Sequence, residues 1–191
     1  MRMSKSIVVG ALLLLAACAG TSKDEGFQGA GKFVDDEVRQ RVAAFKYQSG
    51  PALLQSQRRL AYIGEPAIPH LLDGMRDPSP MTRASCAYVL GMLRDIRTVD
   101  ELLGVARGDS VSTVRYQAAE ALVNIGSKDG FPILIEGLRD PEIRNRYKCF
   151  EVLHDMTKLD FGYAHDAGED EREVAVGRWE QWWSARTSSG A

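Results

Sequence analysis

The stretch AIPHLLDGMRDPSPMTRASCAYVLG, residues 67–91, decides the fold because much of it returns later in the chain. GMRDP at 74–78 is matched by GLRDP at 137–141, 63 residues further on, and without any gap Cys86 falls on Cys149. A third copy lies between these two, so the period is 31–32 residues. Self-similarity at such a period is typical of repeat proteins, in which each unit stacks on its neighbours.

Each copy contains two helical stretches. Apolar residues recur every three or four positions in the first stretch, as at Leu71, Leu72 and Met75, which is the pattern of an amphipathic helix. Asp77-Pro78 and Asp140-Pro141 separate the two stretches, because a residue that precedes proline disfavours the helical conformation. The sequence therefore predicts one helix pair in each repeat.

The pattern of residues 67–91, followed by VSTVRYQAAEALVNIG at 111–126, resembles the HEAT-like repeats of the phycobilisome-lyase type. Upstream, residues 33–48 and 55–64 are expected to form one more, degenerate, pair. The resemblance and the repeat together imply an all-α fold, a short α-solenoid of about four antiparallel helix pairs.

The segment REVAVGRWEQWW, residues 172–183, holds all three tryptophans of the chain. Val176, Trp179 and Trp183 follow helical spacing, which predicts a helix with one strongly aromatic face. Such a helix would cover the open end of the solenoid. The alternative is an exposed aromatic patch that binds a partner or a sugar.

An Asp precedes an Arg by six residues in all three copies. These residues are Asp77 and Arg83, Asp109 and Arg115, and Asp140 and Arg146. A catalytic pair has no reason to occur three times at one spacing, since an active site gathers unlike groups at one place. We therefore expect a structural ladder in which each Asp caps N–H groups of the following helix and each Arg bridges to the Asp of an adjacent copy.

The first twenty residues have the features of a secretory signal. Arg2 and Lys5 precede an apolar run at 7–17 that ends in small residues. LAAC at 15–18 resembles the lipobox of bacterial lipoproteins, and the resemblance implies cleavage before Cys18 and lipidation of that residue. An ordinary signal peptide with an incidental cysteine is the alternative.

These features predict four regions along the chain: a lipoprotein signal peptide at 1–17, a lipidated flexible tether at 18–32, a HEAT-like repeat domain at 33–186 and a disordered tail at 187–191. The expected location is the bacterial cell envelope, with the lipid on Cys18 as membrane anchor. Where an outer membrane exists, the protein would sit on it and face the periplasm.

Little in the sequence indicates chemistry. The formal net charge of −2 provides no excess positive charge for nucleic acid, whose binding depends on neutralising phosphates. His70, His154 and His165 lack the spacing of a metal site, and Cys86 and Cys149 share a small buried register, so we expect free thiols. No catalytic, cofactor-binding or metal-binding residue, no cofactor and no small-molecule ligand is predicted.

The expected function is that of a non-enzymatic scaffold. Second helices commonly line the binding face of a solenoid, and residues outside the core register there would form the surface for another envelope protein: Ser85, Tyr88, Gln117, Glu120, Lys148 and Glu151. Two alternatives stay open. One is an enzyme that resembles bilin lyases and handles a tetrapyrrole, and the other is a structural protein that binds the cell wall.

Overall fold

The computed structural model of the chain describes residues 31–188, and within this range it contains nine α-helices and no strand. The helices are α1 (Lys32–Ala44), α2 (Gly50–Ile63), α3 (Ile68–Gly74), α4 (Pro80–Leu93), α5 (Val99–Gly108), α6 (Ser112–Ile125), α7 (Gly130–Gly137), α8 (Ile143–Thr157) and α9 (Glu169–Ser188). The predicted all-α fold is confirmed. The predicted sites at 1–17 and at Cys18, and nearly all of the predicted tether, lie outside the described residues.

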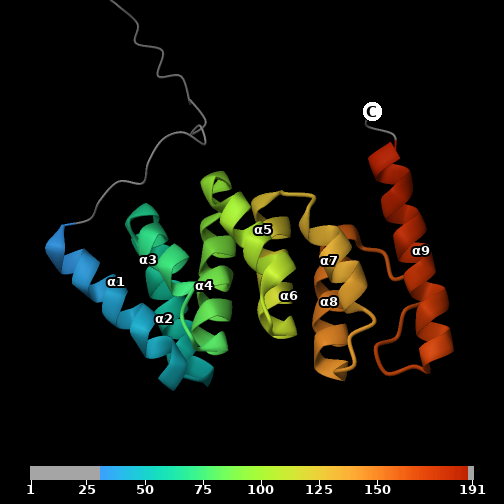
Figure 1. Cartoon of the computed structure of the whole chain (residues 1–191), viewed down its shortest axis with the longest axis horizontal. Coiled ribbons are helices and arrows are strands. Elements are labelled where there is room, and N and C mark those ends of the chain that lie inside the picture. Colours follow the sequence, from blue (N-terminus) through green and yellow to red (C-terminus); the bar gives the residue numbers. More distant parts are fainter. Residues whose placement is uncertain (1–30, 189–191) are drawn as a thin grey trace, which may run out of the picture.

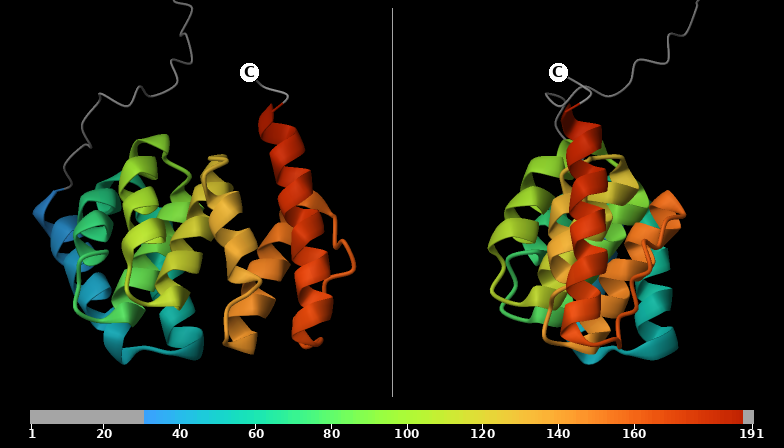
Figure 2. Two further views of the ribbon diagram at one scale, coloured as in Figure 1. Left: turned by 45° about the vertical axis from the view of Figure 1, so that its right-hand side comes forward. Right: turned by 90° about the vertical axis from the view of Figure 1, so that its right-hand side faces the viewer.

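The first eight helices form four pairs that stack side by side. Figure 1 shows the pairs α1/α2, α3/α4, α5/α6 and α7/α8 following one another along the long axis of the molecule. Seen along that axis, α9 lies across the end of the stack (Figure 2). The fold is therefore the predicted short solenoid with a C-terminal capping helix.

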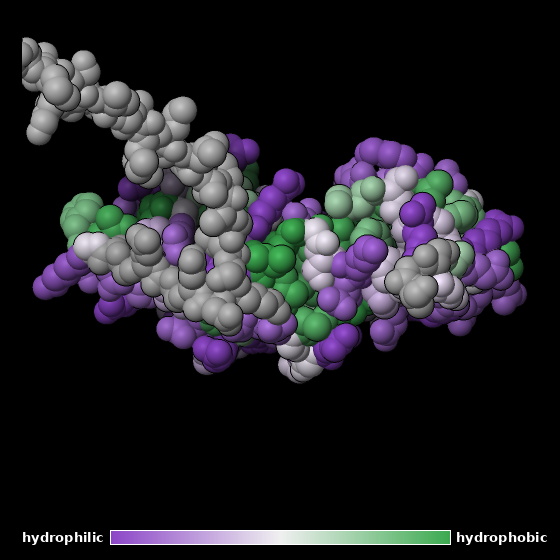
Figure 3. Space-filling model, turned by 90° about the horizontal axis from the view of Figure 1, so that it is seen from above, coloured by the Kyte–Doolittle hydropathy of each residue, from purple (hydrophilic) through white to green (hydrophobic). Residues whose placement is uncertain are grey.

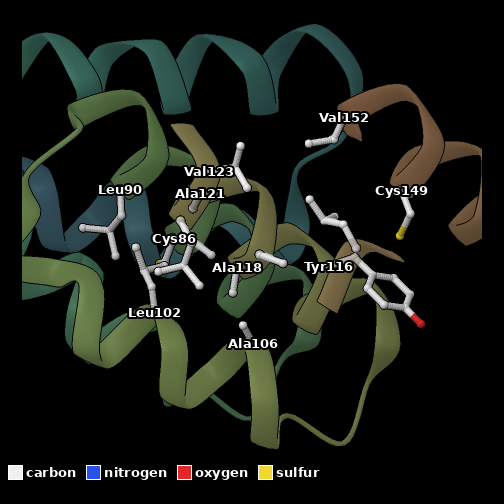
Figure 4. Close-up of a cluster of buried hydrophobic side chains, with 14 of the residues drawn as sticks. Cys86, Leu90, Leu102, Ala106, Tyr116, Ala118, Ala121, Val123, Cys149 and Val152 are labelled. Carbon is white, nitrogen blue, oxygen red and sulfur yellow. The ribbon is translucent and has the colours of Figure 1, made fainter. Parts of the chain in front are cut away.

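The core repeats with the sequence. Six leucines, two from each of the three clear copies, are fully buried: Leu71, Leu90, Leu102, Leu122, Leu134 and Leu153. Each first helix contributes one leucine and each second helix the other, so every pair buries its apolar face against the next pair. At roughly 1.5–3 kcal/mol for each fully buried leucine side chain, this row supplies a large share of the driving force for stacking. Figure 4 shows part of the resulting cluster.

The two helices of a pair approach closely through small residues. A Cβ added at Gly74 would lie 2.4 Å from the Cys86 Sγ, and one added at Gly137 would lie 2.4 Å from the Cys149 Sγ. In the middle copy, Ala106 and Ala118 take the corresponding positions, and Figure 4 shows them facing one another. Cys86 and Cys149 are free and buried, as expected, and burial raises the pKa of both thiols.

The repeated Asp–Arg spacing closes the loop inside each helix pair. In every copy the Asp carboxylate accepts a hydrogen bond from the N–H two residues further on, at Ser79, Val111 and Glu142, over 2.7, 2.9 and 2.9 Å. The Arg that follows six residues later donates to the backbone carbonyl of the same Asp, over 3.0, 2.9 and 2.9 Å for Arg83, Arg115 and Arg146. We call this pair of bonds the loop clamp.

A bridge to the next copy accompanies the loop clamp at one place. The Arg83 guanidinium donates two hydrogen bonds to the Asp109 carboxylate, over 2.7 and 2.8 Å. The matching Arg115 forms no such bond with Asp140 within residues 31–188, because Tyr116 Oη donates to that carboxylate instead, over 2.9 Å. Arg146 donates to the carbonyl of His165 over 2.8 Å. The arrangement is thus a loop clamp in three copies, and among these six residues only Arg83 and Asp109 form an ion pair between copies within residues 31–188, rather than the continuous ladder expected.

Helix α9 covers the end of the solenoid through one aromatic face. Trp179 is fully buried and meets the Phe161 ring edge to face, with 4.8 Å between the ring centroids. Arg139, directly after α7, donates to the carboxylates of Glu173 and Glu180 over 2.8 and 2.6 Å. The helix runs to Ser188, two residues past the expected end of the domain. Trp182 and Trp183 stay partly exposed, so the segment is a cap whose last turns reach the surface.

The surface is mixed in character. Viewed from above, hydrophobic residues come to the surface among hydrophilic ones in the central part of the molecule (Figure 3). Along residues 31–188, none of the helices combines the length and the apolar character needed to cross a membrane.

The close contact of the helix pairs leads to a first prediction. We expect Gly74→Ala to lower the free energy of unfolding by about 1–3 kcal/mol, since overpacking forces neighbours out of place. Combining Gly74→Ala with Cys86→Ala recreates the Ala106/Ala118 arrangement, so the double variant should be more stable than Gly74→Ala alone. Urea denaturation measures both effects.

Gly104→Ala is the matched control for this experiment. Gly104 also lies inside a helix, but an added Cβ there meets nothing within 4 Å. The substitution should stabilise the protein slightly, by up to about 1 kcal/mol, because alanine favours the helix. Equal effects of Gly74→Ala and Gly104→Ala would contradict the proposed packing constraint.

The ion pair between Arg83 and Asp109 leads to a second prediction. Arg83→Met should cost about 2–3 kcal/mol, because it leaves the largely buried Asp109 carboxylate without its cation. Arg115→Met removes an equivalent loop clamp without breaking an ion pair, so it should cost clearly less. Chemical denaturation of the two variants at neutral pH gives the comparison.

The same pair predicts a pH dependence. Hydrogen bonding from Arg83 holds the pKa of the Asp109 carboxyl below its usual value. The stabilisation is therefore present above the usual pKa of about 4 and is lost as the pH falls through the lowered value. The difference in stability between the wild type and Arg83→Met should shrink below about pH 4. A difference that stays constant down to pH 2 would argue against an ionic origin.

Candidate functional site

The second helices form a groove along one face of the solenoid, which we call the inner groove. It consists of two adjoining hollows of about 460 and 270 Å³ that share Met81, Ala84 and Gln117. Residues from α2, α4, α6 and α8 line it: Leu53, Gln57, Pro80, Met81, Ala84, Ser85, Tyr88, Thr113, Tyr116, Gln117, Arg144, Asn145 and Lys148. The groove therefore crosses all four helix pairs, which suits an elongated occupant better than a compact one.

Four of the six residues expected at a partner surface line this groove, namely Ser85, Tyr88, Gln117 and Lys148. Glu120 lies beside the groove, where its carboxylate accepts hydrogen bonds from Gln117 and Lys148. Glu151 lies on an exposed part of α8, where its carboxylate accepts a 3.3 Å hydrogen bond from Tyr147. The structure thus brings Gln117, Glu120 and Lys148 together, whereas Glu151 stays apart from them.

Several lining residues escaped the sequence analysis, although the signal for them was present. Met81 and Thr113 lie four positions before Ser85 and Gln117, and Arg144 lies four positions before Lys148. Residues four apart share one face of a helix. The expected face therefore continues by one turn toward the start of each second helix, where Met81, Thr113 and Arg144 occupy the same register of the repeat.

The floor of the groove contains a buried polar network. Tyr116 donates to the Asp140 carboxylate over 2.9 Å, and Asn145 donates to it over 3.0 Å. Burial and the bond to Asp140 raise the pKa of Tyr116, so the phenol keeps the proton that it donates. The network holds the start of α8 against α6 and sets the shape of the larger hollow.

A carboxylate beside the groove holds the ammonium group of a lining residue. Glu120 Oε1 accepts a hydrogen bond from Lys148 Nζ over 2.9 Å, and its other oxygen accepts one from Gln117 Nε2 over 2.5 Å. The Glu120 side chain is 14% exposed, while that of Lys148 is 38% exposed. The acid is thus held behind the lining residues Gln117 and Lys148, and the Lys148 side chain is the more exposed partner.

The three histidines occupy separate places. His70 of α3 contacts the Asp35 carboxylate of α1. His154 lies against the Phe150 ring, and His165 meets the Tyr147 ring edge to face. Over the part of the chain that the structure describes, no group of three or more His, Cys, Asp or Glu side chains is placed to hold a metal ion.

A protein-family model matches the central part of the chain. The family model described as HEAT repeats matches residues 58–156, more than half of the chain, from the end of α2 to α8. The chain belongs to the HEAT-repeat family. The matched region contains most of the inner groove, so the HEAT repeats themselves build the candidate site.

Curated relatives add a more specific similarity. The deoxyhypusine hydroxylase of Cryptococcus neoformans is 36% identical over 89 residues, which make up 45% of this chain and 25% of that protein. The deoxyhypusine hydroxylase of Drosophila melanogaster is 32% identical over 104 residues, or 54% of this chain and 34% of that protein. The chain thus spans about a quarter to a third of the length of these relatives.

A solved structure agrees with the fold. The CpcE–CpcF complex of phycocyanin lyase from Nostoc contains a chain that matches 76% of this one over 98% of its own length, with a TM-score of 0.55 and 23% identity. Similarity at this level of identity shows a common fold only. It supports the predicted resemblance in architecture and leaves the bilin-lyase alternative without support of its own.

The relatives correct the functional expectations drawn from the sequence. They are enzymes of eukaryotes, so the predicted non-enzymatic, membrane-anchored scaffold was wrong. The expected lipoprotein character and the location in a bacterial envelope were wrong for the same reason. The alternative of a structural protein that binds the cell wall was wrong as well. The error has a physical source, since stacked helix pairs specify a surface rather than a chemistry, and function depends on the site built on them. The expected absence of nucleic-acid binding stays a prediction.

Proposed function

We propose that this chain holds an amine-bearing side chain of a protein substrate in the inner groove, as the substrate-binding HEAT module of an enzyme of the deoxyhypusine hydroxylase kind. The similarity to curated deoxyhypusine hydroxylases supports the class of substrate. The match to HEAT repeats over 58–156 supports the place, because these residues build most of the groove.

The Glu120–Lys148 pair is the observation that carries the proposal. Lys148 Nζ on Glu120 Oε1 has the geometry that the primary ammonium of an incoming side chain would adopt. Because Lys148 approaches from the more exposed side, its long side chain can swing into water and leave the carboxylate to a substrate. Gln117 keeps the other carboxylate oxygen in place, so Glu120 does not need to reorganise when the ammonium groups exchange.

The rest of the groove fits a peptide that carries such a side chain. Leu53, Met81 and Ala84 provide apolar wall for the methylene groups of a long aliphatic amine. Ser85, Gln57 and Asn145 are polar side chains with less than a tenth of their surface exposed, and they can pair with peptide N–H and C=O groups. Binding sites commonly combine apolar walls with a few placed polar groups in this way.

Replacing the groove carboxylate tests the proposal. Glu120→Gln keeps the size of the side chain and removes its charge, so affinity for a peptide with one deoxyhypusine residue should fall about tenfold, or about 1.4 kcal/mol. The same peptide with norleucine at that position should bind equally to both proteins. Isothermal titration calorimetry gives both affinities.

Two further variants sharpen this test. Glu151→Gln is the matched control, because Glu151 takes the register of Glu120 in the following copy but lies away from the groove, and it should leave affinity unchanged. Lys148→Met removes the competing ammonium and should tighten binding of the amine-bearing peptide severalfold. The proposal fails if Glu120→Gln and Glu151→Gln have equal effects, or if Lys148→Met weakens amine binding.

A further inference from the structure

A second hollow lies at the C-terminal end of the solenoid, between α7, α8 and α9. We call it the terminal cleft. Its volume is about 750 Å³, within the range of sites that bind small molecules. The residues that matter here are Lys128, Phe131, Met156, Trp182, Trp183 and Arg186. It shares no lining residue with the inner groove.

Aromatic rings form a packed framework around the cleft. Phe131 of α7 stacks on Trp183 of α9, with ring centroids 5.1 Å apart and planes inclined by 20°. Trp182 lies 5.9 Å from Phe131 and is held from behind by the fully buried Trp179, 5.6 Å away. Because neighbouring rings fix one another, the surface that this framework leaves exposed is already in position to receive a flat apolar group.

The charges at the cleft have one sign. Lys128 and Arg186 line it, and no Asp or Glu does. The Arg186 guanidinium carbon lies 4.7 Å from the centroid of the Trp182 ring. Stacking of this kind orients the planar guanidinium and leaves its N–H edge available for two parallel hydrogen bonds to a carboxylate. With the other described residues, neither Lys128 nor Arg186 forms an ion pair.

We infer that the terminal cleft binds a small organic anion that joins an aromatic ring to a carboxylate. The ring lies against the exposed surface of the Phe131, Trp182 and Trp183 framework, and the carboxylate pairs with Arg186 and Lys128. Met156 adapts its flexible side chain to the ring. This site departs from the expectation of no small-molecule ligand and is independent of the amine site proposed in the inner groove.

The tryptophans provide the assay, because all three of the chain lie on α9. The probe is 3-phenylpropionate, whose phenyl ring does not absorb at the 295 nm used to excite tryptophan. We expect a saturable fluorescence change in the wild type. The neutral 3-phenylpropionamide should bind at least fivefold more weakly, because it keeps the ring and loses the charge.

Variants separate the site from incidental hydrophobic binding. Arg186→Gln should bring 3-phenylpropionate down to the affinity of the amide, and Lys128→Gln should weaken it in part. Arg58→Gln makes the same change of charge at an exposed position of α2, in the first helix pair of the solenoid, and should have no effect. Thermal melts followed by circular dichroism verify that each variant is folded.

Three results would overturn the inference. They are no saturable signal up to millimolar 3-phenylpropionate, equal affinity for the acid and the amide, or equal losses in Arg186→Gln and Arg58→Gln. Binding of the deoxyhypusine peptide should be unchanged in Arg186→Gln, so the two sites can fail separately.

Discussion

The loop clamp is the constraint on which the rest of the structure depends. Each Asp carboxylate binds the N–H two residues ahead, and each following Arg binds the carbonyl of that same Asp. The two bonds hold the short connection between first and second helix in one conformation. Since this happens in three consecutive copies, each second helix leaves its loop in the same direction, and the second helices align into one face.

Close packing of small residues converts that alignment into a fixed spacing. Gly pairs with Cys in two copies, while Ala pairs with Ala in the copy between them. The size lost on one helix is thus gained on the other, so the distance between the two helices stays nearly the same along the solenoid. A regular spacing lets the second helices form a continuous groove instead of separate depressions.

The repeat made most of the fold predictable, because apolar spacing and Asp-Pro breaks are local signals that need no knowledge of distant residues. The partners of individual side chains were harder to predict. Arg83 pairs with Asp109, whereas Tyr116 takes the corresponding place on Asp140. The repeat alone predicts the same Arg–Asp pairing in both cases. The inner groove was predicted only in part. Ser85 and Gln117 were found, whereas Met81 and Thr113, one turn earlier, were missed although they also share a register of the repeat.

The two candidate sites follow from different properties of a finite solenoid. The inner groove exists because similar pairs repeat, and three copies contribute to the walls of its larger hollow. Glu120, in the middle copy, lies beside this hollow through its bonds to Gln117 and Lys148. The terminal cleft exists because the array stops. A capping helix must bury an apolar face against the last pair, but α7 spans only 8 residues while α9 spans 20. The middle of α9 is buried through Ala175, Val176 and Trp179. Trp182 and Trp183, one turn further along, contact Phe131 at the start of α7 and stay partly exposed. Aromatic surface that serves stability in the middle of this helix thus continues, one turn later, into surface that is available for a ligand.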